Sequence, residues 1–279
     1  MKALVLLLLT TLPAGAQTLY FSAIPDDDET RLIARFGAVA DYLEAELGVD
    51  VEYVPVKSYA AAVTAFRADQ IQLGWFGGLS GVQARIAVPG SQALAQGSED
   101  EEFVTYFIAN VDTGIEASEA FPDIAGRRFT FGAQTSTSGR LMPEFWLREE
   151  TGMSPSELFS DVGYSGDHGQ TLRLVASGAY EVGALNYTVY NKAVAEGAPE
   201  ADATRVIWQT PPYPDYNWTI RGDVDARFGD GFTARVRDAL LGMDDADLLA
   251  SFPRAAFIPA DNALYQPIED TARDLDIID

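Results

Sequence analysis

Residues 19–56 read LYFSAIPDDDETRLIARFGAVADYLEAELGVDVEYVPV, and this stretch decides the fold class. The apolar run at 19–24 predicts a strand, which Pro25 ends. Apolar side chains then recur at helical spacing from 26 to 47, and Gly48 can end the helix. A second strand is predicted at 51–56. Strand, helix and strand in this order indicate parallel strands covered by a helix.

The same alternation continues along the 279 residues and predicts an α/β protein. The order of these segments fits two α/β lobes, each a sheet flanked by helices, better than one large sheet. We expect the extended stretches at 106–110 and 206–210 to carry the chain between the lobes as hinge strands. The further predicted strands are 71–76, 128–132, 161–165, 182–186 and 216–220, and the further helices are 59–68, 78–86, 138–150, 171–177, 187–196, 226–241 and 262–275.

The first sixteen residues have the pattern of a cleavable signal peptide. Lys2 gives a positive start, an apolar run follows, and small residues end the segment at 14–16. The alternative is an N-terminal membrane anchor, for which the apolar run is short. The chain has no cysteine, so it lacks the residue that carries a lipid anchor and cannot form disulfides. We therefore expect a freely diffusing protein in the periplasm of a Gram-negative bacterium.

The chain is strongly acidic, with 42 acidic and 19 basic side chains and a net charge of −23. Such a surface repels nucleic acid and anionic membranes, so neither is an expected partner. No segment after the signal peptide is long and apolar enough to predict membrane insertion. Because salt screens surface charges beyond about 8–10 Å, local dipoles decide what a cleft binds.

The hydroxyl-rich segment Ser136-Thr137-Ser138-Gly139 lies between a predicted strand and a predicted helix. A helix start offers unpaired N–H groups with a positive partial charge, and hydroxyls there add neutral donors. Three hydroxyls in a row favour an anion site without a charged side chain. The alternative is an ordinary helix cap, for which one hydroxyl suffices.

His168 is the single histidine of the chain, and it also follows a predicted strand. We expect it to donate to the same anion as the hydroxyl-rich segment, because both belong to the same lobe. The alternative is a helix-cap or turn residue. One histidine without any cysteine argues against a zinc site.

In the other predicted lobe, Tyr59 and the Phe76-Gly77-Gly78 segment follow strands. Loops at the carboxyl ends of parallel strands are where such sheets bind ligands. Tyr59 can donate its hydroxyl across the cleft, and the glycine N–H groups can close over the ligand. For Phe76 the alternative is packing in the core.

The segment Pro211-Pro212-Tyr213-Pro214-Asp215-Tyr216 follows the second predicted crossing. Its prolines favour a rigid turn at a hinge. The alternative is that Tyr213, Asp215 and Tyr216 reach the mouth of the cleft. No nucleophile elbow, phosphate-binding glycine loop or histidine pair occurs in the chain, so we expect neither an enzyme nor a cofactor or metal.

These residues resemble the phosphate/phosphite/phosphonate family of ABC-transporter substrate-binding proteins. The resemblance runs from about residue 19 to the last predicted helix. Its most specific part is the Ser-Thr-Ser-Gly segment at 136–139. The remaining matches are Ala23-Ile24-Pro25, Val54-Pro55-Val56 with Tyr59, the glycines after Trp75-Phe76, His168 after Ser165-Gly166, and Gly183-Ala184-Leu185-Asn186.

The resemblance implies a type II periplasmic binding protein with two hinged lobes. Its first lobe is discontinuous, and with the predicted hinges it comprises 17–108 and 208–279, while 109–207 form the second. The implied partners are a small oxyanion and the permease of an ABC importer with its cytoplasmic ATPase, and we expect a monomer. A receptor that reports to a membrane histidine kinase would use the same cleft, and this alternative stays open.

By this resemblance Ser136, Thr137, Ser138 and His168 hold the oxyanion, and Tyr59 closes from the other lobe. Relatives that bind aminoalkylphosphonates grip the amine with acidic side chains, whereas Asn186 is neutral here. Some similar sequences belong to a branch labelled selenate receptors. A cleft of donors alone would suit selenate, which carries no proton. A buried carboxylate, from Asp215 or Asp26, would instead suit a protonated phosphite or phosphonate.

Overall fold

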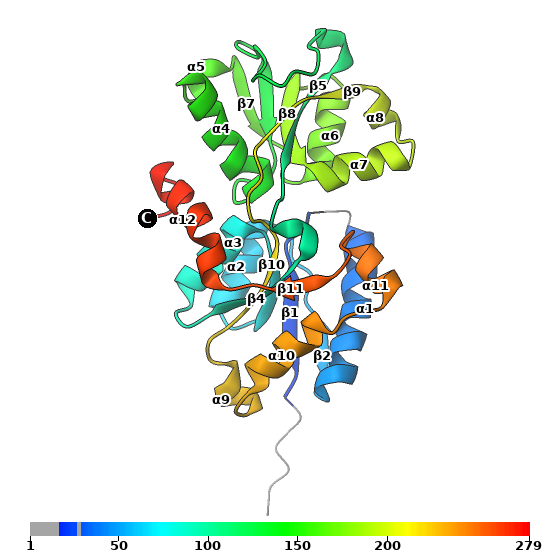
Figure 1. The fold of residues 1–279 in the computed structure, drawn as a ribbon, viewed down its shortest axis with the longest axis vertical. Coiled ribbons are helices and arrows are strands. Elements are labelled where there is room, and N and C mark those ends of the chain that lie inside the picture. The colour runs from blue at the N-terminus through cyan, green and yellow to red at the C-terminus, as the bar shows by residue number, and fades with distance from the viewer. Residues whose placement is uncertain (1–16, 27–28) are drawn as a thin grey trace, which may run out of the picture.

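The structure is a computed structural model that describes residues 17–26 and 29–279. It consists of two lobes, each built around one sheet (Figure 1). The chain starts in the lower lobe, passes to the upper lobe and returns, so the lower lobe is discontinuous in sequence. The predicted signal peptide, residues 1–16, and part of the predicted helix cap, 27–28, lie outside the described residues.

The lower lobe contains a mixed sheet of six strands. In spatial order they are β11 (Phe257–Pro259), β4 (Gln92–Gly97), β10 (Asn217–Ile220), β3 (Leu73–Phe76), β1 (Leu19–Ala23) and β2 (Val51–Tyr53). The predicted parallel pairing holds for β1 with β2 and β3. β10 runs antiparallel to both of its neighbours. β4 and β11 were not predicted, and the alanine and glutamine side chains of β4 have low strand propensity.

The upper lobe contains a mixed sheet of five strands. In spatial order they are β7 (Asp161–Tyr164), β6 (Arg128–Phe131), β8 (Val182–Asn186), β5 (Thr105–Asn110) and β9 (Thr204–Gln209). β6 is parallel to β7 and β8, whereas β5 is antiparallel to β8 and β9. Each sheet thus has a parallel part made by strand–helix–strand units and an antiparallel strand next to a lobe crossing, β10 in the lower sheet and β5 in the upper. In the lower sheet the edge strand β11 is also antiparallel to its neighbour β4.

Helices cover the faces of both sheets (Figure 1). The lower lobe has α1 (Glu29–Leu47), α2 (Tyr59–Arg67), α3 (Gly78–Ala87), α9 (Val224–Phe228), α10 (Phe232–Leu241), α11 (Ala246–Ser251) and α12 (Gln266–Asp274), and the upper lobe has α4 (Met142–Thr151), α5 (Pro155–Leu158), α6 (His168–Ala176), α7 (Tyr187–Ala195) and α8 (Pro199–Asp202). The single helix predicted at 226–241 is wrong, because Gly229 and Gly231 adopt positive φ and separate α9 from α10. The helix predicted from 171 begins already at His168.

Two connections join the lobes, as predicted, but the predicted positions 106–110 and 206–210 are displaced, because 106–110 and 206–209 lie within β5 and β9 of the upper sheet. The chain instead crosses at 98–104 and 210–216, which we call the crossing segments. They pair with each other: Phe103 and Tyr213 exchange backbone hydrogen bonds of 2.9 and 3.0 Å. The predicted lobe boundaries at 108 and 208 would divide β5 and β9. We therefore propose boundaries within the crossing segments.

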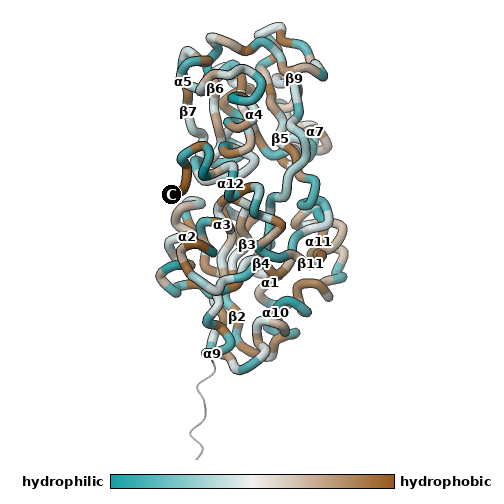
Figure 2. The backbone as a smooth tube through the Cα atoms, turned by 60° about the vertical axis from the view of Figure 1, so that its left-hand side comes forward, coloured by the Kyte–Doolittle hydropathy of each residue, from teal (hydrophilic) through white to brown (hydrophobic). Residues whose placement is uncertain are grey.

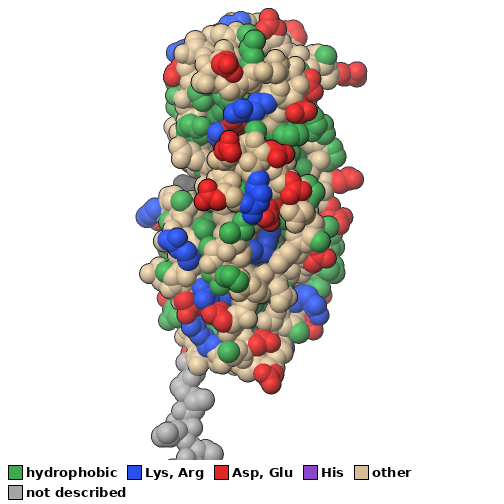
Figure 3. Space-filling model, turned by 90° about the vertical axis from the view of Figure 1, so that its left-hand side faces the viewer, with side chains coloured by type: hydrophobic (Ala, Val, Ile, Leu, Met, Phe, Trp, Pro, Cys, Tyr) green, Lys and Arg blue, Asp and Glu red, His purple; other side chains and the backbone are tan. Residues whose placement is uncertain are grey.

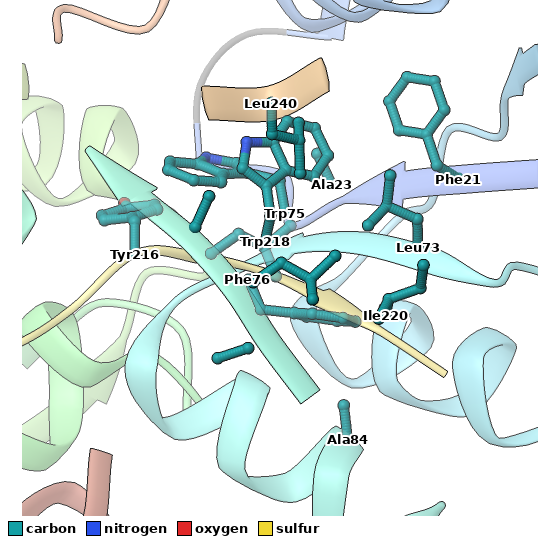
Figure 4. Packing of buried hydrophobic residues seen from close by; sticks show 14 of the residues in the cluster. Phe21, Ala23, Leu73, Trp75, Phe76, Ala84, Tyr216, Trp218, Ile220 and Leu240 are labelled. Atoms are coloured by element: carbon teal, nitrogen blue, oxygen red, sulfur yellow. The ribbon is translucent and has the colours of Figure 1, made fainter. Parts of the chain in front are cut away.

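The core of the lower lobe is aromatic and extends to a crossing segment. Trp75 of β3 and Trp218 of β10 lie side by side, with ring centroids 5.3 Å apart (Figure 4). Trp75 also stacks on Tyr216 of the second crossing segment, at 5.5 Å. The upper lobe has one apolar cluster around Phe129 and another around Val175. Figure 2 shows hydrophobic residues running through the interior of each lobe. The second crossing segment is therefore held by packing against the lower core.

The surface mixes both signs of charge. On the face that Figure 3 shows, acidic and basic side chains are interspersed, and the hydrophobic side chains are scattered. In the described part of the chain, no helix has the length and apolar character to cross a bilayer.

Candidate functional site

The site lies between the lobes, beside the crossing segments. The upper lobe contributes the loop after β6, which continues into a π-helical turn at Thr137–Leu141, and the start of α6. The lower lobe contributes the starts of α2 and α3. Helix starts from both lobes therefore meet, and their N–H groups and partial positive charges point into the same space.

The hydroxyl-rich loop is buried and held rigidly. Ser136, Thr137 and Ser138 are each at most 2% exposed. The Ser136 hydroxyl accepts a hydrogen bond of 2.9 Å from the Gly139 amide, which caps the turn. A Cβ on Gly139 would lie 3.1 Å from a ring carbon of His168, so glycine allows the histidine to approach the loop. The loop thus combines the capping role and the predicted position in the cleft.

His168 is the first residue of α6 and is fully buried. Its Nδ1 accepts a hydrogen bond of 3.2 Å from the Asn186 amide, so the neutral ring carries its proton on Nε2. Burial lowers the pKa of His168 to about 4, and the ring is neutral at pH 7. Nε2 lies 3.5 Å from the Tyr59 hydroxyl. His168 is therefore a neutral donor directed into the cleft.

Tyr59 reaches the cleft from the lower lobe. It opens α2, whose N-cap Ser58 accepts from the Ala61 amide at 3.1 Å. Its hydroxyl meets both His168 and Ser136 of the upper lobe. Burial raises the pKa of Tyr59 well above 10, so the phenol keeps its proton. Tyr59 and His168, which are 109 positions apart in the chain, are thereby brought together as donors.

Gly77 and Gly78 let α3 approach the upper lobe closely. The Leu79 amide donates to the Thr137 hydroxyl at 3.0 Å, which joins the two lobes. A Cβ on Gly77 would lie 3.1 Å from a carboxyl oxygen of Asp215 and 3.2 Å from the Thr137 hydroxyl. The glycine segment therefore lies against the hydroxyl-rich loop, and its predicted closure over a ligand stays a prediction. The Gly78 amide donates to Asp215, and the amide of the following Leu79 donates to Thr137.

Asp215 is a buried carboxyl in the cleft. Its Oδ1 accepts from the Gly78 amide at 2.9 Å, whereas Oδ2 has no hydrogen-bond partner among the described residues. The hydroxyls of Thr137 and Ser138 lie beside it. Burial raises the pKa of Asp215 to about 7, against the Gly78 and Thr137 hydrogen bonds that lower it. A carboxyl of this kind exchanges a proton close to neutral pH.

Asn186 and Tyr216 connect the upper lobe to the second crossing segment. The Asn186 carbonyl oxygen caps α7 by accepting from the Thr188 amide at 2.7 Å. Its amide nitrogen donates to the Tyr216 hydroxyl at 3.0 Å. Asn186 thus faces Tyr216, and the phenol proton of Tyr216 is left for another acceptor. Tyr213 and Tyr216, for which the sequence left open a rigid hinge turn or a position at the cleft mouth, are both buried.

Phe76 does not fit its predicted role. Its ring packs edge to face on Phe66, with centroids 5.6 Å apart, and lies beneath Gly74 in the core of the lower lobe. The core alternative therefore describes Phe76, and we expect it to support the glycine loop from below.

A small cavity of about 40 Å³ adjoins this cluster, lined among others by Asp26, Trp75, Asn186 and Tyr216. A space of this size holds one or two water molecules. Asp26 also contributes to the raised pKa values of Tyr59 and Tyr216, after burial as the larger cause. Both acids that the sequence analysis singled out, Asp26 and Asp215, thus lie near the donors. Among the described residues, no group of three or more acidic or histidine side chains is placed to hold a metal.

Residues 21–265 match the family model of ABC-transporter phosphonate periplasmic substrate-binding proteins. The chain belongs to this family. It is also 38% identical, over 95% of its length and 92% of the relative's, to the probable ABC transporter phosphite binding protein PhnD1 of Prochlorococcus marinus. The solved structure of PhnD1 with methylphosphonate superposes with a TM-score of 0.90, covering 94% of this chain and 99% of that one.

A more distant solved structure shares the architecture. A binding protein component of an ABC phosphonate transporter from Pseudomonas aeruginosa is 19% identical, with a TM-score of 0.79 over 91% of this chain and 85% of that one. At this identity the likeness shows the fold alone. The predicted type II periplasmic binding protein fold, with two sheets flanked by helices, is thereby confirmed. The family consists of periplasmic substrate-binding components of ABC transporters.

Proposed function

We propose that this protein captures a small phosphorus oxyanion that carries a proton, phosphite or methylphosphonate, for an ABC importer. The observation that carries the proposal is Asp215, a buried carboxyl among neutral donors whose Oδ2 has no hydrogen-bond partner in the described part of the chain. The names of PhnD1 and of its complex mention phosphite and methylphosphonate, which supports the same ligand class.

Neutral donors suit this task. His168 and Tyr59 each offer an N–H or O–H without a charge of their own, and the hydroxyl-rich loop adds hydroxyls and amides. Fixed dipoles in a buried site stabilise an anion without the desolvation cost of a buried cation. This arrangement explains how a chain with a net charge of −23 can hold an anion.

The carboxyl of Asp215 favours a ligand with a proton. Phosphite and methylphosphonate monoanions have a P–OH group that can donate to Oδ2, whereas selenate and sulfate do not. Two unprotonated oxygens facing each other in a buried site would cost several kcal/mol. The cleft of donors alone, which would suit selenate, is therefore not the arrangement that we favour.

Lobe closure completes the proposed mechanism. The ligand contacts residues of both lobes, so its binding shifts the population of the protein towards the closed form. We propose that the permease recognises this form, that residues 1–16 direct export, and that the protein acts as a monomer without catalysis. No feature of the described residues favours the histidine-kinase sensor that the sequence left open, and the matched family belongs to transporters.

Calorimetric titration against phosphite, methylphosphonate, phosphate, sulfate and selenate at pH 7 tests the ligand. We expect phosphite and methylphosphonate to bind more tightly than sulfate and selenate, because the former bring the shared proton themselves, whereas sulfate and selenate fit only when Asp215 is protonated. Equal or tighter selenate binding would contradict the proposed role of this carboxyl. Binding of none of the five anions would contradict the proposed function as a whole.

A further inference from the structure

A buried ion pair lies beside the crossing segments. Arg254, between α11 and β11, donates through Nε and Nη2 to the two carboxylate oxygens of Asp100, at 2.8 and 2.7 Å. The Arg254 side chain is 3% exposed and that of Asp100 is fully buried. The Gly97 amide donates to the same carboxylate at 3.0 Å. This two-pronged contact between ionised groups is strong and directional.

The pair touches both crossing segments. Asp100 belongs to the first, and the Arg254 guanidinium lies over the Phe103 ring of the same segment, 5.6 Å from its centroid. It also lies 5.4 Å from the ring centroid of Tyr216, in the second segment. Arg254 comes from the C-terminal part of the lower lobe. One guanidinium thus fastens both crossing segments to that lobe.

The pair also reaches Asp215 of the cleft. The Asp100 carbonyl accepts a hydrogen bond of 3.0 Å from the Asp215 amide. The charge of Asp100 is close enough to raise the pKa of Asp215, although burial is the larger cause. The remaining polar groups around this carboxyl are the Gly78 amide, the hydroxyls of Thr137 and Ser138, and the phenols of Tyr59, Tyr213, Tyr216 and Tyr265, which burial keeps protonated.

Stability alone does not account for this arrangement. Well-packed apolar residues often replace a buried ion pair without loss of stability. The hydrogen bond from the Asp215 amide to the Asp100 carbonyl is a main-chain contact, so an apolar pair that kept the crossing segment in place would retain it. An apolar pair would, however, place no charge near the cleft. The geometry therefore points to a role of the Asp100–Arg254 pair in the ligand site, exerted through Asp215.

We propose that Asp100 and Arg254 are a positioning pair for the ligand site, which orients Asp215 and sets how readily it holds the proton that the ligand shares. The part of this proposal that concerns a proton shared between Asp215 and the ligand rests on the proposed function. The orientation and the charge effect concern the ligand-free protein, so they are measurable without any ligand.

Carboxyl ¹³C NMR titration of the ligand-free protein tests the proposal, with Asp215→Asn used to assign the Asp215 signal. Asp100→Asn leaves the positive charge of Arg254 unopposed. We expect Asp215 then to lose its proton about one pH unit lower than in the wild type. The double variant Asp100→Asn with Arg254→Met removes both charges. Its Asp215 titration midpoint should lie between that of the wild type and that of Asp100→Asn.

The control is Asp223→Asn, which breaks a more exposed ion pair with Arg221 in the same lobe. It should leave the Asp215 midpoint unchanged. An unchanged midpoint in folded Asp100→Asn would overturn the proposal. If that variant does not fold, the double variant decides, and a wild-type midpoint there would overturn it. Failure of the wild type to bind phosphite or methylphosphonate would overturn the proposed function and leave the titration result standing.

Discussion

At the scale of single residues, the cleft works through neutral donors placed around one carboxyl. Ser138→Ala removes a hydroxyl beside Asp215. We expect methylphosphonate binding to weaken by about 1–3 kcal/mol, the cost of losing a hydrogen bond to a charged group. Calorimetry measures this change. Ser177→Ala, in an exposed turn, is the matched control and should bind as the wild type does.

Asp215→Asn should reverse the pH dependence of binding. In the wild type, Asp215 loses its proton as the pH rises past about 7, and its charge then opposes the bound anion. Affinity for methylphosphonate should therefore fall above pH 7. An asparagine amide donates to a fully ionised ligand, so the variant should keep or gain affinity there and should bind selenate better. Parallel pH profiles for wild type and variant would contradict the role given to Asp215.

At the scale of elements, the turn after β6 depends on a glycine. A Cβ at Gly139 would meet the Ser136 hydroxyl at 3.0 Å, and Gly132 and His168 at 3.1 Å each. Because these neighbours include main chain, we expect Gly139→Ala to lower stability by about 1–3 kcal/mol and to weaken ligand binding. Thermal unfolding and calorimetry measure the two effects. Gly37→Ala is the control, since its Cβ would meet nothing within 4 Å in α1.

At the scale of the whole molecule, two site residues should give the unliganded protein opposite pH dependences. The pKa of His168 is lowered to about 4, so its contribution to stability is present above pH 6.5 and is lost as the pH falls through 4. The pKa of Asp215 is raised to about 7, so its contribution is present below pH 4 and is lost as the pH rises through 7.

Denaturant unfolding between pH 4 and 7 separates these effects. Asp215→Asn removes the opposing contribution, so its stability should rise with pH more steeply than that of the wild type. The added slope should amount to a few kcal/mol across the window, as an order of magnitude. His168→Gln should show the reverse trend. Identical slopes in all three proteins would mean that neither pKa is shifted by folding.

Much of the fold could be predicted, because the spacing of apolar residues along the chain indicates each helix and strand locally. The apolar spacing of α1 and the strands around it fixed the first strand–helix–strand unit, and the parallel pairs followed. Strands whose pairing partners lie far away in the sequence were harder to predict. β4, with the sequence QALAQG, has little strand pattern of its own and becomes a strand because β10 and β11 pair with it. The predicted crossings fell on β5 and β9 for the same reason. An extended sequence pattern does not reveal whether a segment pairs within a sheet or passes between lobes.

By itself, the sequence determined the α/β lobes and the neutral donors at two helix starts, because strand pattern and capping chemistry are local. Only the tertiary structure decided which nitrogen of His168 carries the proton and that Asp215 titrates near pH 7. Both depend on burial and on partners far away in the chain. Gly78 and Asp215, 137 residues apart, meet only when the lobes and crossing segments are assembled.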